Sequence, residues 1–298
     1  MFEGFTREWI ETGEAEIHLV RGGEGPPLLL LHGYPQSHVC WHKVAPRLTE
    51  TFSLVIPDLR GYGDSSGPAP DDGPGEENEA YSKRAMAEDM VEVMRTLGHE
   101  RFALAGHDRG GRVAYRLALD TPETVTRLAT LDIVPTLEMA ERVDLGLAVS
   151  TYHWFFLAQP APLPERLILG DPDFYLEHTL QSWLGARGEI APAALAEYRR
   201  CFGEESVVRA TCADYRAGLT SDLENDRADR AAGRRIACPL LALWGAESSE
   251  QKAALDFEAI WRGWAEDVTG VAIDAGHFLM EEAPEETAEA LLRFFTTH

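Results

Sequence analysis

Short apolar runs alternate along much of the chain with longer segments that have helical periodicity. Before them, residues 6–11 (TREWIE) and 15–21 (AEIHLVR) alternate apolar and polar positions around a turn at Thr12 and Gly13, which predicts an opening β-hairpin. The later runs are apolar throughout, as is typical of strands buried on both faces of a mostly parallel sheet. These runs are PLLLLHG (27–33), FSLVIPD (52–58), RFALAG (101–106), VTRLATLD (125–132) and PLLALWG (239–245).

Helices are predicted between these runs. Residues 82–97 place apolar side chains on one helical face, with Ser82 as the N-cap and Gly98 after the last turn. A second helix is predicted from Gly110 to Asp120. Strands that alternate with helices predict an α/β fold with an open sheet, in which functional residues lie at the carboxyl ends of the strands.

The strand pattern is interrupted between Ile133 and Ile236, where the sequence is helical and aromatic. We therefore expect a core domain formed by residues 1–135 and 236–298, with residues 136–235 inserted as a helical cap. The acidic segment 68–80 is rich in Pro and Gly and is predicted to be a solvated loop.

Composition narrows the classes of partner. A chain of 298 residues, of which 45% are hydrophobic, can form one large core with a smaller inserted lobe. The net charge of -23 opposes binding to nucleic acid and to anionic membranes, and no run of Lys or Arg offsets it locally. We find no signal segment and no apolar run of membrane-spanning length, so we expect a soluble, cytoplasmic protein.

The four cysteines have neither the spacing of a metal site nor the density of a disulfide scaffold, and we expect reduced thiols. His38, Cys40 and His42 in HVCWH resemble a metal cluster, but no further ligand is evident. We therefore predict no metal site there.

The segment FALAGHDRGG (102–111) carries the main chemical signal. It predicts a strand, a sharp turn and a helix, with Asp108 between Gly106 and Gly110. This is the pattern of a nucleophile elbow in which aspartate replaces serine. The alternative is that Asp108 only caps the following helix.

Two later segments supply the partners of such a nucleophile. Asp132 ends the predicted strand 125–132, and His277 follows a strand in DAGHFLMEEAP. The chain order nucleophile, acid, histidine is the one that elbow-containing hydrolases use. Glu247 also follows a strand and is the alternative acid, although its position is less favourable than that of Asp132.

The segments LLHGYPQS, IPDLRGYGDSS, GHDRGGR and DAGHFLMEEAP resemble the α/β-hydrolase superfamily over nearly the whole chain. Within it the chain is similar to fluoroacetate dehalogenases, which share HDRGGR at the elbow. They also share an adjacent His-Trp in the cap, here His153 and Trp154, and a cap tyrosine in DYRAG, here Tyr215. Haloalkane dehalogenases usually, and epoxide hydrolases commonly, have Trp directly after the nucleophile, where this chain has Arg109.

The resemblance implies attack on a saturated carbon. Asp108 would displace a leaving group and form an alkyl ester, which water activated by His277 would hydrolyse. Asp132 would orient His277, and the backbone amides of Tyr34 and Arg109 would bind the oxyanion.

Charge and hydrogen bonding suggest roles for the remaining candidates. Arg109 and Arg112 would bind the carboxylate of the substrate. Arg109 is the preferred ligand, because Arg112 could instead pair with a structural acid such as Asp58 or Asp132. The resemblance implies that a departing halide would accept hydrogen bonds from the cap residues His153, Trp154 and Tyr215. Without the resemblance, the aromatic segment TYHWFF would be interpreted as packing within the cap.

We therefore expect a haloacetate dehalogenase that hydrolyses small 2-haloacids, fluoroacetate and chloroacetate included, to a 2-hydroxyacid and halide without a cofactor. Its partner would be a small anionic substrate, and a homodimer remains open. The alternatives are an epoxide hydrolase and a noncatalytic, hydrolase-like ligand-binding protein.

Overall fold

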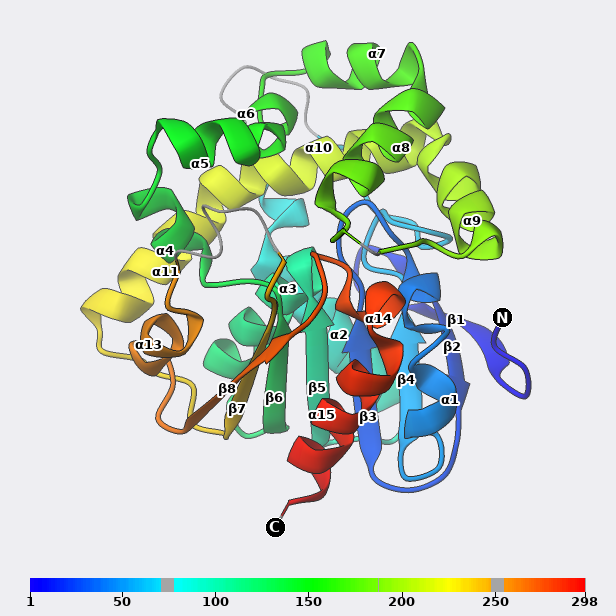
Figure 1. Ribbon diagram of the computed structural model, residues 1–298, viewed down its shortest axis with the longest axis vertical. Coiled ribbons are helices and arrows are strands. Elements are labelled where there is room, and N and C mark those ends of the chain that lie inside the picture. Colours follow the sequence, from blue (N-terminus) through cyan, green and yellow to red (C-terminus); the bar gives the residue numbers. More distant parts are fainter. Residues whose placement is uncertain (71–77, 187, 248–254, 298) are drawn as a thin grey trace.

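The computed structural model describes residues 1–70, 78–186, 188–247 and 255–297. Eight strands form one sheet in the order β1-β2-β4-β3-β5-β6-β7-β8 (Figure 1). The strands are β1 (Thr6–Glu11), β2 (Glu16–Gly22), β3 (Pro27–Leu31), β4 (Ser53–Pro57), β5 (Phe102–His107), β6 (Val125–Leu131), β7 (Leu240–Gly245) and β8 (Val268–Ile273). Residues 71–77 of the predicted acidic loop lie outside the described residues.

The strand pairing confirms the predicted opening hairpin and mostly parallel sheet. β1 pairs antiparallel with β2, with Ile10 opposite Ile17, and β2 pairs antiparallel with β4. All other neighbouring strands are parallel. Strand β8 has no continuous apolar run because it lies at the edge of the sheet, where only Ile273 is fully buried.

Helices flank both faces of the sheet (Figure 1). They are η1 (His38–Trp41), α1 (Ala45–Leu48), η2 (Glu79–Tyr81), α2 (Lys83–Thr96), α3 (Asp108–Asp120), α13 (Phe257–Arg262), α14 (Leu279–Glu282) and α15 (Pro284–Thr296). The Ser82 side chain accepts a hydrogen bond from Ala85 N, which explains why α2 begins where the capping pattern predicts. Helix α3 begins at Asp108, two residues before the predicted start at Gly110.

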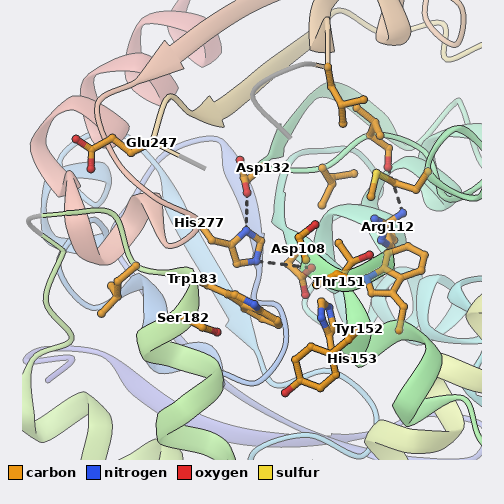
Figure 2. Close-up of a pocket in the computed structure, with 18 of the residues that line it drawn as sticks. Asp108, Arg112, Asp132, Thr151, Tyr152, His153, Ser182, Trp183, Glu247 and His277 are labelled. Carbon is orange, nitrogen blue, oxygen red and sulfur yellow. Dashed lines mark hydrogen bonds and ion pairs between the residues drawn. The ribbon is translucent and has the colours of Figure 1, made fainter. Parts of the chain in front are cut away.

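The segment between β6 and β7 is helical in its described residues. Its helices are α4 (Thr136–Glu141), α5 (Leu145–Ser150), α6 (Tyr152–Leu157), α7 (Leu163–Leu169), α8 (Pro172–Trp183), α9 (Pro192–Phe202), α10 (Glu205–Leu219) and α11 (Ser221–Ala231). Together, called the cap below, they lie over the carboxyl ends of the strands (Figure 1). A cavity opens between this cap and the sheet (Figure 2).

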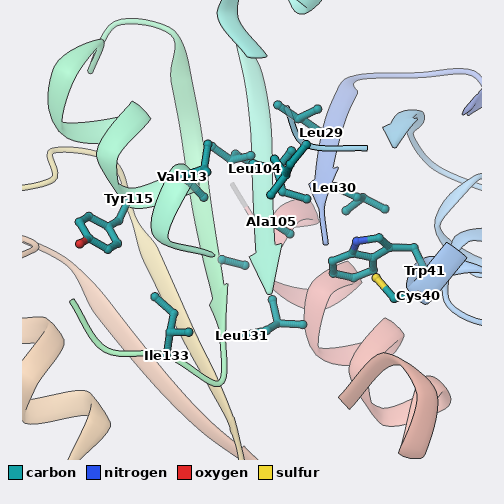
Figure 3. Close-up of a cluster of buried hydrophobic side chains, with 14 of the residues drawn as sticks. Leu29, Leu30, Cys40, Trp41, Leu104, Ala105, Val113, Tyr115, Leu131 and Ile133 are labelled. Carbon is teal, nitrogen blue, oxygen red and sulfur yellow. The ribbon is translucent and has the colours of Figure 1, made fainter. Parts of the chain in front are cut away.

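The centre of the sheet rests on a buried apolar cluster (Figure 3). Leu29 and Leu30 of β3, Leu104 and Ala105 of β5, and Val113 of α3 are fully buried in it. Burial of a Leu or Val side chain stabilises a fold by about 1.5–3 kcal/mol. The cluster therefore makes the ends of β3 and β5 a rigid support for the residues that follow them.

No helix in the described ranges has the length and apolar character needed to cross a membrane. All four cysteines, Cys40, Cys201, Cys212 and Cys238, are free thiols.

Candidate active site

Asp108 lies at a sharp turn directly after β5. Its φ of 46° is in the left-handed region, which few residues other than glycine adopt, although aspartate is better tolerated there than most. The loop after β3 passes so close that a Cβ on Gly33 would lie 2.4 Å from Asp108 Cβ. Glycine at position 33 therefore lets the two loops meet and directs the Asp108 side chain toward the cap.

The cavity beneath the cap has a volume of about 390 Å³. Charged and aromatic side chains line it from both sides, and Figure 2 shows them converging from the strand ends and from cap helices. They include Asp108, Arg112, Asp132, His153, Trp154, Trp183 and His277. The structure thus brings most of the predicted site residues to one cavity.

The two carboxylate oxygens of Asp108 have different surroundings. Oδ1 accepts a hydrogen bond of 2.9 Å from the backbone amide of Tyr34. Oδ2 lies 3.8 Å from Nε2 of His277, which is too long for a hydrogen bond. Burial raises the pKa of the Asp108 carboxyl, but His277, His107 and the nearby guanidinium groups together hold it below its usual range. Asp108 is therefore an anion at neutral pH.

The two predicted oxyanion donors, the amides of Tyr34 and Arg109, come from the loop after β3 and from the start of α3. The amide of Tyr34 already contacts Oδ1. The amide of Arg109 belongs to the first turn of α3, where backbone N–H groups have no partner within the helix.

His277 is hydrogen-bonded to Asp132. The distance from His277 Nδ1 to Asp132 Oδ2 is 2.5 Å, and Asp132 Oδ1 accepts a hydrogen bond of 3.0 Å from Gly245 N. Glu247, the alternative acid, is exposed and accepts a hydrogen bond from Ala186 N instead. The geometry of the imidazole therefore favours Asp132 as its partner.

Arg109 is bound to an acid that the sequence did not single out. Its Nε donates to Asp214 Oδ2 at 3.0 Å, and its Nη2 donates to the carboxylate and to the carbonyl oxygen of the same residue. Burial lowers the pKa of Arg109, but Asp214 outweighs it, so the pKa lies well above the usual value. Two of the three guanidinium nitrogens are thus occupied by the cap helix α10.

Arg112 is different, because it forms no salt bridge with a carboxylate in the described part of the chain. Its Nη1 donates to Val134 O at 3.1 Å and to Thr136 Oγ1 at 2.9 Å, while its buried Nε has no hydrogen-bond partner among the described residues. Burial lowers its pKa. Arg112 lines the cavity, and the two acids proposed as its structural partners, Asp58 and Asp132, are bound to histidines instead. Arg112 is therefore better placed than Arg109 to receive a carboxylate.

The three aromatic candidates of the cap lie against one another. The ring of Tyr215 is 5.8 Å from that of His153 and 6.2 Å from that of Trp154, measured between centroids. Burial raises the pKa of Tyr215 well above its usual value, and the hydroxyl finds no hydrogen-bond partner among the described residues. The guanidinium carbon of Arg112 lies 4.5 Å from the Trp154 ring centroid, so these aromatic rings adjoin the cationic side of the cavity.

The sequence interpretation missed Trp183 and Asp214. Trp183 ends α8 and lines the cavity, with its ring centroid 4.5 Å from that of His153 and 5.2 Å from that of His277. Asp214 directly precedes Tyr215, and an acid beside a predicted site residue was the available signal. Its carboxylate also binds Lys83 and, at 2.7 Å, the hydroxyl of Tyr62.

One group of described residues could hold a metal ion, namely His18, His38 and Asp58. The Nδ1 atoms of the two histidines lie 2.8 and 2.9 Å from the carboxylate of Asp58, and all three side chains are buried. Mutual hydrogen bonds account for this arrangement. Cys40 and His42 are not part of the group.

Comparison with known proteins identifies the family. The family model for the alpha/beta hydrolase fold matches residues 26–284. A fluoroacetate dehalogenase from Burkholderia sp. is 44% identical over 300 residues, covering 99% of this chain and 95% of the relative. A soluble epoxide hydrolase from Corynebacterium sp. is 34% identical over 283 residues, covering 94% and 93%.

A solved structure from Nostoc sp., described as an alpha/beta hydrolase, is 51% identical and superposes with a TM-score of 0.95 over 100% of both chains. The chain belongs to the alpha/beta hydrolase family, and it is a hydrolase.

Proposed function

We propose that this hydrolase cleaves the carbon–halogen bond of small 2-haloacids, such as fluoroacetate and chloroacetate, to give a 2-hydroxyacid and halide. One observation carries the proposal. The anionic Asp108 shares a cavity with Arg112, a buried guanidinium group that forms no salt bridge with a carboxylate among the described residues. A nucleophile for a saturated carbon therefore lies beside a binding group for a carboxylate.

In the first step, Asp108 Oδ2 attacks the carbon that carries the halogen. The carbon–halogen bond breaks with its electron pair, and the halide leaves. The amide of Tyr34 holds Oδ1, so Oδ2 is the oxygen free to form the ester bond. Arg112 offsets the repulsion between the substrate carboxylate and Asp108, and hydrogen bonds from His153, Trp154 and Tyr215 stabilise the departing halide.

In the second step, water attacks Cγ of the ester and His277 Nε2 takes one of its protons. The 3.8 Å between Nε2 and Oδ2 leaves the imidazole close to the carboxyl group without a direct hydrogen bond. The intermediate collapses, and the hydroxyacid leaves with the former Oδ2 and the proton from His277. Asp108 keeps the oxygen of the water and releases the remaining proton, so the net products are hydroxyacid, halide and one proton.

The first test is product analysis with three substrates. Fluoroacetate and chloroacetate are expected to release halide with one equivalent of glycolate, whereas a simple uncharged epoxide should not be hydrolysed. Asp108→Asn serves as the control and should abolish halide release. Hydrolysis of the epoxide without halide release would instead establish an epoxide hydrolase, and a lack of any product would support a ligand-binding protein.

A further inference from the structure

The loop that carries His277 is held by hydrogen bonds to the backbone of three consecutive residues, 276–278. The amides of Gly276 and Phe278 donate to the two carboxylate oxygens of Glu282, at 3.0 and 2.9 Å. The amide of His277 itself donates to Trp183 O at 2.9 Å, and its carbonyl oxygen lies 2.8 Å from His107 Nε2. The residues on both sides of His277 are therefore bound to the same side chain.

Glu282 also reaches the cap. Its Oε2 accepts a hydrogen bond of 2.7 Å from Gly185 N, in the segment directly after α8. The two backbones approach so closely that a Cβ on Gly276 would lie 2.2 Å from Gly185 N. Glu282 thus connects the His277 loop to the end of α8, where Trp183 packs against the imidazole in Figure 2.

His277 must be held in a fixed position to serve the second step. In the proposed function, His277 acts only after the ester has formed, and its Nε2 must then stand at a fixed distance from a water molecule. A displacement of about 1 Å in a catalytic group can reduce a rate about 100-fold. The hydrogen bond to Asp132 fixes the orientation of the ring but not the path of the backbone that carries it.

We infer that Glu282 is a positioning residue for His277, which fixes the imidazole for ester hydrolysis by holding both flanking amides and the cap segment after α8. The inference rests on the proposed function. Glu282 is not among the described residues that line the cavity, and the hydrogen bonds that it accepts from described residues come from backbone amides, so it acts on His277 through the backbone.

The test separates the two half-reactions in single turnover with chloroacetate. In Glu282→Gln, an amide nitrogen replaces one acceptor oxygen, so at least one of the three donors loses its partner. The rate of formation of the Asp108 ester, measured as chloride release, is expected to stay within about threefold of that of the parent enzyme. The rate of ester hydrolysis, measured by intact-protein mass spectrometry, is expected to fall about 10- to 100-fold.

Two matched variants define the controls. Glu285→Gln makes the same change at an exposed position near the start of α15 and should leave both steps unchanged. Glu247→Gln removes the carboxylate that binds Ala186 N, in the same cap segment, but it does not touch the amides beside His277. A defect in Glu282→Gln that Glu247→Gln does not reproduce therefore belongs to the His277 loop.

A double variant excludes a general structural effect. In His277→Ala the ester forms but is hydrolysed only by the residual, unassisted reaction, so adding Glu282→Gln should slow hydrolysis no further. If Glu282→Gln does not fold, Glu282→Asp tests the same point, because it keeps the charge but withdraws the carboxylate by one methylene group. The amplitude of the chloride burst gives the active fraction in each case.

Several results would overturn the inference. They are equal slowing of both steps, unchanged ester hydrolysis, or further slowing in the double variant. Failure of the proposed function is distinguishable, since His277→Ala would then form no ester on Asp108 at all.

Discussion

Replacing Arg112 with Lys is expected to reduce kcat/KM for chloroacetate strongly, although the formal charge is retained. Nη1 of Arg112 is fixed by Val134 O and Thr136 Oγ1, and Nε is buried with no hydrogen-bond partner in the part of the chain that the structure describes. A guanidinium group held in this way can present parallel N–H donors to a carboxylate, whereas an ammonium group is a mobile point charge.

The size of the effect follows from the bonds that are lost. A hydrogen bond to a charged group contributes about 1.5–3 kcal/mol. Loss of one such bond to the substrate corresponds to a reduction of about 10- to 150-fold, because each 1.4 kcal/mol changes an equilibrium constant about tenfold. The buried position of Arg112, which is 3% exposed, argues against compensation by water.

Arg109→Lys is the matched control, since it makes the same change three residues earlier on the same helix. Two nitrogens of Arg109 are bound to Asp214, so the main cost should be stability. We expect the free energy of unfolding in urea to fall by about 1–3 kcal/mol, with a smaller loss of chloroacetate turnover than in Arg112→Lys.

The assay compares chloride release from chloroacetate and from uncharged chloroacetamide by each folded variant. Arg112→Lys should reduce the preference for the acid, because the amide has no carboxylate to lose. Equal losses of activity with the acid and the amide, or a change in chloroacetate turnover of less than about threefold, would show that Arg112 does not bind the substrate carboxylate.

Three further outcomes test the other proposed roles. His277→Ala should accumulate a carboxymethyl ester on Asp108, seen by mass spectrometry and peptide mapping, and an unmodified Asp108 despite bound substrate would contradict the mechanism. Asp132→Asn should lower kcat by up to about 10⁴-fold, because the imidazole loses the partner that stabilises its cation. Glu247→Gln should have much less effect, and the reverse ranking would make Glu247 the acid. Tyr215→Phe should slow the first step for fluoroacetate by about 100- to 1000-fold and for chloroacetate much less, because fluoride depends more on hydrogen bonding as it leaves. Equal losses for the two substrates would mean that the Tyr215 ring only packs within the cap.

Local sequence rules predicted the elements on which the site is built. The five apolar runs are β3 to β7. Ser82 is the N-cap as predicted, and α2 begins at the next residue. These features depend on residues that are neighbours in the sequence, so the pattern of apolar and polar residues is enough to predict them. The elbow was also visible, because small residues beside Asp108 are a local requirement of the turn.

Contacts between distant segments were not predictable in the same way. Arg109 and Asp214 are 105 residues apart, and they meet only because the fold brings α10 of the cap to the start of α3. The sequence interpretation preferred Arg109 to Arg112 as the carboxylate ligand, because Arg112 was the one expected to pair with a structural acid. In the structure Asp214 of the cap binds Arg109, so our proposal assigns the substrate carboxylate to Arg112 instead.

The charges in the cavity separate the two proposed steps and give a kinetic criterion for them. In the proposed function, Asp108 faces an anionic substrate before the first step, so Arg112 should control binding and alkylation. Alkylation makes Asp108 a neutral ester, and the new charge of the second step develops on His277, which Asp132 contacts at 2.5 Å.

Release of halide makes the first step effectively irreversible, and kcat/KM then reports only events up to that point. Asp132→Asn should therefore lower kcat and leave kcat/KM for chloroacetate nearly unchanged, whereas Arg112→Lys should lower kcat/KM. A parallel fall of both constants in Asp132→Asn would mean that this carboxylate also serves the alkylation step, and the division between the two charged groups would not hold.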